Sequence, residues 1–294
     1  MKILTIGNKG QLGTSMEKLM EKKSFADVLY LDLPDFDLTN EKNIKDCISA
    51  FKPDLIINCA AYTAVDDAEK EIELAYNINS LGVKWIGKYS SQIKAKVIHI
   101  STDYVFDGNS NQPLTPENEV NPQSVYGKSK LEGEKFLMAE NQNSTIIRTS
   151  WLYSPFGKNF VNTMLNLGKQ KETINVVYDQ IGTPTYAEDL ASLIIYIAER
   201  IKTDKAFFVP GIYHYSNEGV CSWYDFAVMI FKISGIKCRV NPILSMEYPT
   251  LAQRPKYSVF DKTLIKRQFG ISLHNWVDSL ERMLRSSQNV SSVK

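Results

Sequence analysis

The stretch that decides the predicted fold is residues 3–13, ILTIGNKGQLG. A short, mostly apolar run from Ile3 to Ile6 leads into Gly7, further glycines follow at Gly10 and Gly13, and apolar residues at helical spacing come next. A strand, a glycine-rich turn and a helix in this order are typical of a dinucleotide-binding unit. The glycines allow a tight turn, a close backbone approach to a pyrophosphate and close packing of helix on strand. The helix N-terminus adds unpaired N–H groups and a partial positive charge for the anion. Such glycines also occur in ordinary turns, so the rest of the chain has to support this interpretation.

Strands and helices alternate outward from this stretch as far as residue 150. The apolar runs typical of strands and the helical patterns between them cover residues 28–31, 41–51, 55–58, 69–92, 97–100 and 145–147, with a further helix at Tyr126. This alternation predicts an α/β fold, a Rossmann-type doubly wound parallel sheet. After Trp151 the rhythm loosens, which predicts a smaller, discontinuous C-terminal domain. The division that we predict is a dinucleotide-binding domain of residues 1–150 plus about 187–210, and a second domain of residues 151–186 and 211–294.

Length and composition are those of an ordinary globular protein. The 294 residues carry 34 lysines and arginines against 33 acidic residues, and the net charge of +1 gives no pull toward nucleic acid or an anionic membrane. Four scattered cysteines without a CxxC pair suit a reducing compartment and argue against disulfides or a structural zinc site. The N-terminal apolar run is too short for a secretory signal, and no stretch approaches the ~18 apolar residues of a membrane span. We therefore expect a cytoplasmic protein with no nucleic-acid or membrane partner.

Residues that follow the predicted strands mark the edge where a cofactor would sit. Asp32 ends the second strand, and a carboxylate there typically holds the adenosine ribose hydroxyls and disfavours a 2′-phosphate. This favours NAD over NADP, although Lys9 in the glycine turn could meet a 2′-phosphate, and Asp32 could also be a simple loop acid. Asp37 and Leu38 are candidates for the adenine pocket. The small residues among CAAYT at 59–63 leave room for a cofactor or simply pack closely.

A tyrosine and a lysine four residues apart, Tyr126 and Lys130, lie in the stretch SVYGKSKLEGE at 124–134. On a helix this spacing puts both side chains on one face, where a phenol can pass a proton to a substrate and an ammonium can assist. The same spacing also arises by chance on solvated helix faces. Its weight increases because the fourth strand closes on Thr102, whose hydroxyl would face the same crevice. His99 lies within the apolar run of that strand and is predicted to be a core histidine.

The glycine turn, Thr102 and the Tyr126–Lys130 pair together resemble the extended short-chain dehydrogenase/reductase family. The likeness continues in blocks that look like the successive signatures of the dTDP-4-dehydrorhamnose reductases, namely NCAAYTAVDDAE, ISTDYVFDG, VYGKSKLEGE, IIRTSWLY, NFVNTML, DQIGTPT, SWYDFA and AQRPKYSVFD. These blocks run in order across nearly the whole chain. The resemblance implies an NADPH- or NADH-dependent oxidoreductase of dTDP-rhamnose and polysaccharide biosynthesis. Such an enzyme reduces the C4 ketone of dTDP-4-dehydro-L-rhamnose to give dTDP-L-rhamnose.

The resemblance also implies a role for each matching residue. Tyr126 would donate the proton, Lys130 would lower the pKa of that tyrosine and hold the nicotinamide ribose, and Thr102 would polarise the ketone. The cofactor-binding positions would be Gly7, Gly10, Gln11, Leu12 and Gly13 at the pyrophosphate, and Asp32, Asp37, Leu38, Ala61, Tyr62 and Thr63 around the adenosine. Asp103 and Trp151 would touch the sugar nucleotide, although Trp151 could also be a core aromatic.

Two differences from related sequences narrow the expected reaction and the expected oligomeric state. Related nucleotide-sugar dehydratases carry an Asp-Glu pair after the threonine, whereas Tyr104 follows Asp103 here, so dehydration is disfavoured. Some reductases of this family form a dimer through a magnesium ion held by glutamates. One of those positions is Ser15 here, although Glu188 fits another. We therefore expect no metal and either a monomer or a homodimer that is not bridged by magnesium.

Two other functions stay open at this point. One is a reductase of a neighbouring 4-keto-6-deoxy nucleotide sugar, because the sequence does not determine which ketone face meets the nicotinamide. The other is a non-catalytic regulatory subunit, since the beta subunit of methionine adenosyltransferase looks like this family. The intact Thr102, Tyr126 and Lys130 favour an enzyme.

Overall fold

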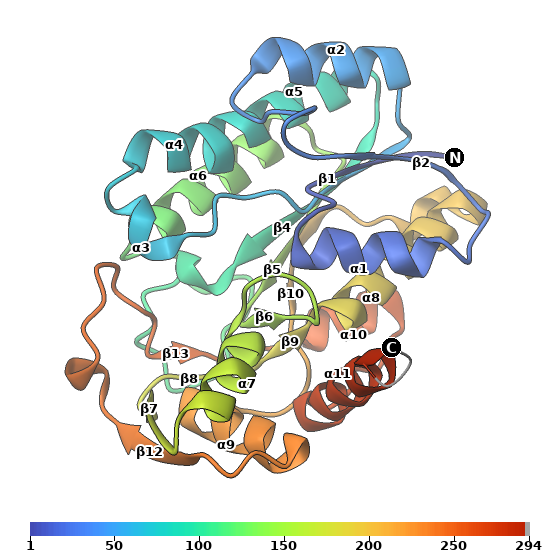
Figure 1. Cartoon of the computed structure of the whole chain (residues 1–294). Helices are drawn as coiled ribbons and strands as arrows, with labels where there is room; N and C mark the ends of the chain where they lie inside the picture. The colour runs from blue at the N-terminus through green and yellow to red at the C-terminus, as the bar shows by residue number, and fades with distance from the viewer. Residues whose placement is uncertain (292–294) are drawn as a thin grey trace.

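The computed structural model describes residues 1–291, and a six-stranded sheet lies at its centre (Figure 1). Its strands, in spatial order, are β10 (Gly211–Tyr215), β5 (Ser144–Thr149), β4 (Lys96–Thr102), β3 (Leu55–Asn58), β1 (Lys2–Ile6) and β2 (Asp27–Leu31). All five neighbouring pairs are parallel. The strand order reverses between β1 and β3, and ligands bind at the carboxyl ends of strands at such a switch point. The predicted Rossmann-type α/β class is confirmed.

Helices cover both faces of the sheet, because successive residues of a strand point to opposite sides. Ile3 of β1 packs with α1 (Gln11–Met20) and α8 (Ala187–Thr203) in one aliphatic core. Leu4, the next residue, packs on the other side in a second core. The helices that contribute buried residues to that second core are α2 (Glu41–Phe51), α5 (Gly82–Gln92) and α6 (Val125–Glu140). The strands, the five helices and their connections are called the sheet half below.

The helix predicted over residues 69–92 is present from Ile72 to Gln92, and it contains a π-helical turn that the sequence pattern does not predict. It consists of α4 (Ile72–Tyr76), the π-helical turn η1 (Asn77–Leu81) and α5, and a short helix, α3 (Val65–Ala68), precedes it. Asn79 in the π turn holds the loop after β3 by accepting from the backbone N–H of Tyr62 at 2.9 Å and donating to its carbonyl at 3.1 Å. The wider turn therefore fixes a loop at the carboxyl edge of the sheet, and π turns are frequent at such functional places.

Beyond residue 151 the chain builds short strand pairs around an aromatic core, which we call the substrate half. The strands are β6 (Leu152–Tyr153), β7 (Thr173–Val177), β8 (Ile181–Gly182), β9 (Thr185–Tyr186), β11 (Cys221–Ser222), β12 (Arg239–Ile243) and β13 (Tyr257–Ser258). The helices are α7 (Phe160–Gln170), α9 (Trp223–Ser234), α10 (Thr263–Phe269) and α11 (Trp276–Ser291), with a 3₁₀ turn η4 (Ser245–Glu247). Two other 3₁₀ turns, η2 (Asp103–Val105) and η3 (Lys205–Phe207), are connections within the sheet half. In Figure 1 most of this half lies below the sheet. Its core contains Tyr153, Tyr186, Phe226 and Trp276.

The predicted domain boundary at residue 211 falls at the start of β10. That strand pairs with β5 along the edge of the sheet, and Ile265 and Phe269 of α10 pack in the aliphatic core beneath it. The division into two domains stays a prediction, and the sheet itself extends to Tyr215. No helix within residues 1–291 is long and apolar enough to cross a membrane. All four cysteines are free.

Candidate active site

A cavity of about 720 Å³ opens at the carboxyl ends of the sheet strands. It is lined from both halves of the molecule, with the glycine turn at one end and residues 149–152 and 157–158 on the far wall. The predicted site residues that line it are Gly7, Gly10, Gln11, Leu12, Asp32, Asp37, Leu38, Ala61, Thr63, Thr102, Asp103, Tyr126, Lys130 and Trp151. Gly13 and Tyr62 are not among the residues that line this cavity. The structure therefore brings together nearly all of the positions that the sequence singled out.

The glycine turn is a backbone cradle with no room for a side chain at Gly7 or Gly13. Gly7 has a φ of +84°, and a Cβ there would lie 2.6 Å from the backbone nitrogen of Ala60. A Cβ on Gly13 would clash with the carbonyl oxygen of Gly7, so Gly13 serves the close packing of α1 rather than the cavity wall. The α1 N-cap is Gly10, which offers no side chain to the first N–H groups of the helix. Those donors and the positive end of the helix suit a pyrophosphate.

Gln11 connects the cradle to the substrate half. Its side-chain oxygen accepts from the Ser154 hydroxyl at 3.1 Å and from the Asn159 amide at 2.9 Å. The sequence pattern predicts Gln11 only as a pyrophosphate contact and does not indicate this link across more than 140 positions.

The acidic residues after β2 are held by their own loops. The Asp32 carboxylate accepts from the backbone N–H of Lys9 at 2.9 Å and of Leu33 at 2.8 Å, and the Lys9 ammonium donates to the Leu33 carbonyl. Asp37 accepts from the Thr39 backbone and hydroxyl, both at 2.8 Å. Asp32, Asp37 and Lys9 nevertheless all line the cavity. The carboxylates could accept hydrogen bonds from ribose hydroxyls, and the ammonium could pair with a 2′-phosphate.

Tyr62 is oriented away from the cavity. Its hydroxyl donates to Glu71 at 2.6 Å, and this bond is the largest cause that raises its pKa to about 12. The contribution of Tyr62 to cofactor binding therefore stays a prediction, with only its neighbours Ala61 and Thr63 in the cavity wall.

Tyr126 lies at the start of α6, where Ser124 caps the helix by accepting from the Gly127 backbone at 3.1 Å. The tyrosine is 9% exposed and packs edge-on against Tyr104, with 5.4 Å between ring centroids. Burial raises its pKa, hydrogen bonding with Thr102 opposes this, and the charge of Asp103 adds to the rise. The phenol is thus firmly protonated in this state, as a proton donor must be before it acts.

Lys130 lies one turn along the same helix face and is 1% exposed. Its ammonium donates to the Ile100 carbonyl at 2.7 Å and faces His99 Nε2 at 3.2 Å. Burial lowers the pKa of Lys130 to about 8, with Glu134 and Cys59 opposing the shift. Lys130 is not among the causes that shift the pKa of Tyr126 here, so the predicted lowering by Lys130 stays a prediction for the cofactor-bound enzyme.

His99 is buried, as predicted for a core histidine, but it also contacts the site. Asn58 accepts from the Ala60 backbone through its oxygen, so its amide nitrogen is the group that faces His99 Nδ1 at 3.1 Å. That arrangement places the proton of the neutral ring on Nε2, which can hydrogen-bond Lys130 only when the lysine is an uncharged amine. Burial and the Lys130 charge hold the pKa of His99 well below its usual range.

Thr102 and Asp103 form a buried hydrogen-bonded pair beneath Tyr126. The Thr102 hydroxyl donates to Asp103 Oδ1 at 3.0 Å, and the Ser258 hydroxyl donates to Asp103 Oδ2 at 2.6 Å. Burial raises the pKa of Asp103 to about 6, and the two hydroxyls limit the rise. Ser258 lies 155 positions along the chain, within the quoted block AQRPKYSVFD, and sequence reasoning missed it.

Trp151 lines the cavity from the substrate half. Its ring stacks on Trp223 with 3.6 Å between centroids and 9° between planes, and a Cβ on Gly182 would lie 2.7 Å from its indole. Its backbone has a φ of +49°, a left-handed conformation that is rare for a large side chain. Trp151 is therefore partly buried against the aromatic core while it also forms part of the cavity wall.

The rim of the cavity carries a polar clamp that the sequence did not reveal. Asp66 of α3 accepts from the backbone N–H of Ala252 at 3.0 Å and pairs with the Arg254 guanidinium. Arg254 also donates to the Tyr104 hydroxyl at 3.0 Å. The loop before β13 is thereby tied to the sheet half next to the ring that packs on Tyr126.

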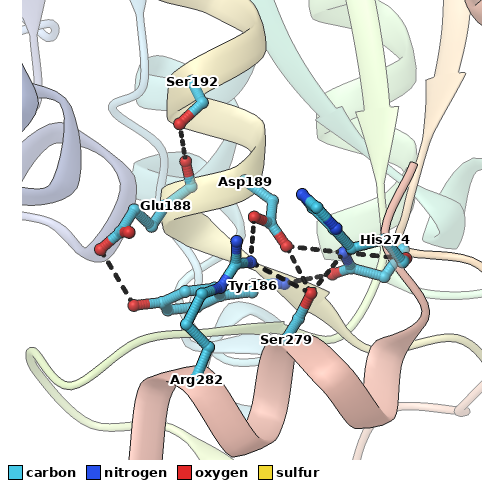
Figure 2. A network of polar contacts seen from close by, with 8 residues as sticks. Tyr186, Glu188, Asp189, Ser192, His274, Ser279 and Arg282 are labelled. Atoms are coloured by element: carbon cyan, nitrogen blue, oxygen red, sulfur yellow. Dashed lines mark hydrogen bonds and ion pairs between the residues drawn. The ribbon is translucent and has the colours of Figure 1, made fainter. Parts of the chain in front are cut away.

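A second polar network joins α8 to α11 (Figure 2). Asp189 is 8% exposed, accepts from the Ser279 hydroxyl at 2.6 Å and the Asn217 amide at 2.7 Å, and pairs with Arg282. The neighbouring Glu188 accepts from the Tyr186 hydroxyl at 3.0 Å. Within residues 1–291 no group of three or more His, Cys, Asp or Glu side chains is placed to hold a metal.

Comparison with known proteins agrees with this geometry. The family model described as the RmlD substrate binding domain matches residues 1–289. The chain is 42% identical to the dTDP-4-dehydrorhamnose reductase of Aggregatibacter actinomycetemcomitans over 96% of this chain and 98% of the relative. It is also 37% identical to the Escherichia coli K12 reductase, over 97% of both chains. This chain belongs to the dTDP-4-dehydrorhamnose reductase family.

Solved structures of this family have the same fold. A reductase from Clostridium acetobutylicum superposes with a TM-score of 0.92 at 43% identity, covering 98% of this chain and 100% of that one. A reductase from Bacillus anthracis, solved in complex with NADP, superposes with a TM-score of 0.90 at 38% identity, covering 97% and 99%. The chain is thus an NAD(P)H-dependent oxidoreductase, and the regulatory-subunit interpretation has no further support.

Proposed function

We propose that this enzyme reduces the C4 ketone of dTDP-4-dehydro-L-rhamnose to give dTDP-L-rhamnose. The observation that carries the proposal is the meeting of Thr102, Tyr126 and Lys130 with the glycine cradle in one cavity. The family relatives carry the reductase name and match this chain over nearly its whole length.

The residues present fit a nicotinamide dinucleotide. The cradle excludes side chains at Gly7, the N-terminus of α1 offers free N–H donors, and Asp32 and Asp37 line the end of the cavity where an adenosine ribose would lie. When bound, the reduced nicotinamide would supply the hydride to C4. Either NADPH or NADH is compatible with Asp32 and Lys9 standing side by side.

The chain's own residues would deliver the proton and hold the ketone. Tyr126, protonated because of its burial, would pass its proton to the alkoxide oxygen that develops at C4. Thr102 would donate a hydrogen bond to the same oxygen and so stabilise its charge. Lys130 would hold the nicotinamide ribose, and ligand binding would draw its ammonium away from Ile100 toward the tyrosine.

The substrate half would present the sugar. Trp151 is fixed by its stack on Trp223, so it would offer a flat face against the sugar ring, and Asp103 would lie beneath the reacting carbon. A fixed wall restricts the ring to one orientation, which determines the face of the ketone that receives the hydride.

The test is an assay with authentic dTDP-4-dehydro-L-rhamnose and either NADPH or NADH. We expect the absorbance of the reduced nicotinamide to decline only when the sugar is present, with dTDP-L-rhamnose as the product. A neighbouring 4-keto-6-deoxy nucleotide sugar is the control substrate. Faster turnover of that control would assign the chain to the related reductase, and no turnover of either sugar would refute the proposal.

Oligomeric state and location are also proposals. We propose a monomer or a homodimer without a bridging magnesium ion, because Ser15 is buried and its hydroxyl donates to the Gln11 carbonyl at 2.8 Å. We propose a cytoplasmic site of action from the free cysteines and the nucleotide-sugar substrate. Light scattering with and without a chelator tests the proposed oligomeric state.

A further inference from the structure

We propose that Asp103 stores the proton which recharges Tyr126 in each turnover, and that its protonation turns the hydroxyl of Thr102 toward the substrate. This inference rests on the proposed function. It begins from the hydrogen bonds around a carboxyl that is 3% exposed and was expected only to touch the sugar. That carboxyl is bonded to Thr102 on one oxygen and to Ser258 on the other.

The hydroxyl of Thr102 has only one proton, and the structure shows where it goes. It accepts from the Tyr104 backbone N–H at 3.3 Å and donates to Asp103 at 3.0 Å. While Asp103 is ionised it accepts this proton, since a carboxylate cannot donate. In that state Thr102 has nothing left to donate to Tyr126 or to a ketone.

Protonation of Asp103 on Oδ1 reverses the direction of the bond. The carboxyl then donates to Thr102, and the Thr102 proton becomes free for the oxygen of Tyr126 or of the ketone. The bond from Ser258 to Oδ2 remains, so every group stays satisfied in both states. The two arrangements differ by one proton and by no heavy-atom movement.

The reaction consumes one proton, and the chain Tyr126–Thr102–Asp103 can supply it. The C4 alkoxide takes the proton of Tyr126, the phenolate takes the proton of Thr102, and Thr102 takes the proton of Asp103. One O–H bond breaks and one forms at each step, and Asp103 ends as a carboxylate. It regains a proton from water in the cavity that it lines.

The charged surroundings of Asp103 are compatible with both states. Tyr126 on α6 and Tyr104 on η2 face it, Arg254 and Asp66 lie behind Tyr104, Lys130 lines the same cavity, and Ser258 approaches from β13. No cation is among the groups that shift its pKa, which burial raises to about 6. An anionic nucleotide bound nearby raises that pKa further.

The decisive experiment is kcat against pH for the full-length enzyme with saturating NADPH and dTDP-4-dehydro-L-rhamnose. The protonated form of Asp103 is the active one, so kcat of the wild type should fall as pH rises through a pKa at or above about 6. Asp103→Asn should lower kcat by about 10²-fold and abolish this limb, because the amide cannot release a proton. An unchanged limb, with the effect confined to KM for the sugar, would overturn the inference.

Ser258→Ala gives a second measurement that does not depend on how Asp103→Asn folds. Loss of the Ser258 hydrogen bond removes a cause that lowers the pKa of Asp103, so the limb should move to higher pH. Ser279→Ala is the matched control, since it also removes a buried serine that donates to an aspartate, here Asp189 (Figure 2). It should lower stability and leave the limb in place. A limb that stays in place in Ser258→Ala would also overturn the inference, whereas absence of turnover in the wild type would refute the proposed function instead.

Discussion

The sheet half and the substrate half share one cavity but are held together by different interactions. In the sheet half, strands of four to seven residues pair along their length and aliphatic side chains fill both faces. In the substrate half several strands have only two residues, and contacts between aromatic rings and between polar side chains hold the elements together instead. The Trp151–Trp223 stack and the Asp189 network are the clearest cases.

This difference separates two ways of positioning ligand-binding groups. The cofactor end of the cavity is built largely from backbone, so it depends on glycine and on the helix N-terminus. The sugar end is built from side chains, which a single substitution can remove. Substitutions in the two halves should therefore affect different kinetic constants, and four experiments test this.

The largest effect is expected for Tyr126→Phe. Loss of the phenol should reduce kcat by ~10²–10⁴-fold, the usual contribution of a general acid. The ring keeps its edge-on contact with Tyr104, so the fold and the Kd for NADPH should stay close to wild type. Steady-state rates and a cofactor titration check both. A variant that retains the wild-type rate would mean that the proton comes from elsewhere.

Next comes Asp189→Ala, at the junction between the halves. It leaves the Ser279 hydroxyl without its acceptor, removes one acceptor of the Asn217 amide and removes the carboxylate partner of Arg282. We expect the free energy of unfolding to fall by about 2–3 kcal/mol, measured by denaturant titration. Glu188→Ala is the matched control, because that carboxylate accepts a single hydrogen bond, from the Tyr186 hydroxyl, and its loss should cost less than ~1 kcal/mol. Equal losses of unfolding free energy in the two variants would show that the Asp189 network does not specifically join the two halves.

A smaller effect is expected at the glycine cradle, where Gly13→Ala and Gly10→Ala form a pair. The Cβ at position 13 would clash with backbone, which should lower stability by about 1–3 kcal/mol. The Cβ at position 10 would meet only the Gly7 carbonyl oxygen, at 3.4 Å, so the fold should tolerate it. It would project into the cavity and weaken NADPH binding by about tenfold, or 1.4 kcal/mol. Thermal unfolding and cofactor titration separate the two effects.

The smallest effect is expected for Trp223→Ala. Removal of the stack should free Trp151 and raise KM for the sugar by about fivefold to tenfold, since such a contact is worth ~0.5–1.5 kcal/mol. KM for NADPH should not change. Trp85→Ala, which alters an aromatic packed on the core of the sheet half, is the control and should leave KM for the sugar unchanged. A parallel rise in both Michaelis constants would contradict the separation of the halves.

The sheet half was largely predictable because its signals are local. The predicted α2 and β3 agree with the structure at both ends, and the helix with Tyr126 and Lys130 is present. The π-helical turn within the helix over 69–92 was not predictable, because Asn79 bonds to the loop at Tyr62, a contact that no helical periodicity encodes. The pairing of β10 with β5 was not predictable either, because the two strands lie more than 60 residues apart.

The site was predictable as a set of positions but not as a network. Motif spacing singled out Thr102, Tyr126 and Lys130, whereas their partners Ser258 and His99 became evident only in three dimensions. Spacing also carries no information on burial. The pKa of Tyr126 therefore had to come from its surroundings, where desolvation is the largest cause.

The left-handed backbone of Trp151 has a consequence for engineering this enzyme. A large residue in that conformation costs on the order of 1–3 kcal/mol, and it persists here between Trp223 and Gly182. Glycine or asparagine would relieve the strain and remove the wall of the sugar site. The same substitution would lose the stack on Trp223, so backbone strain, packing and turnover are coupled at this one position.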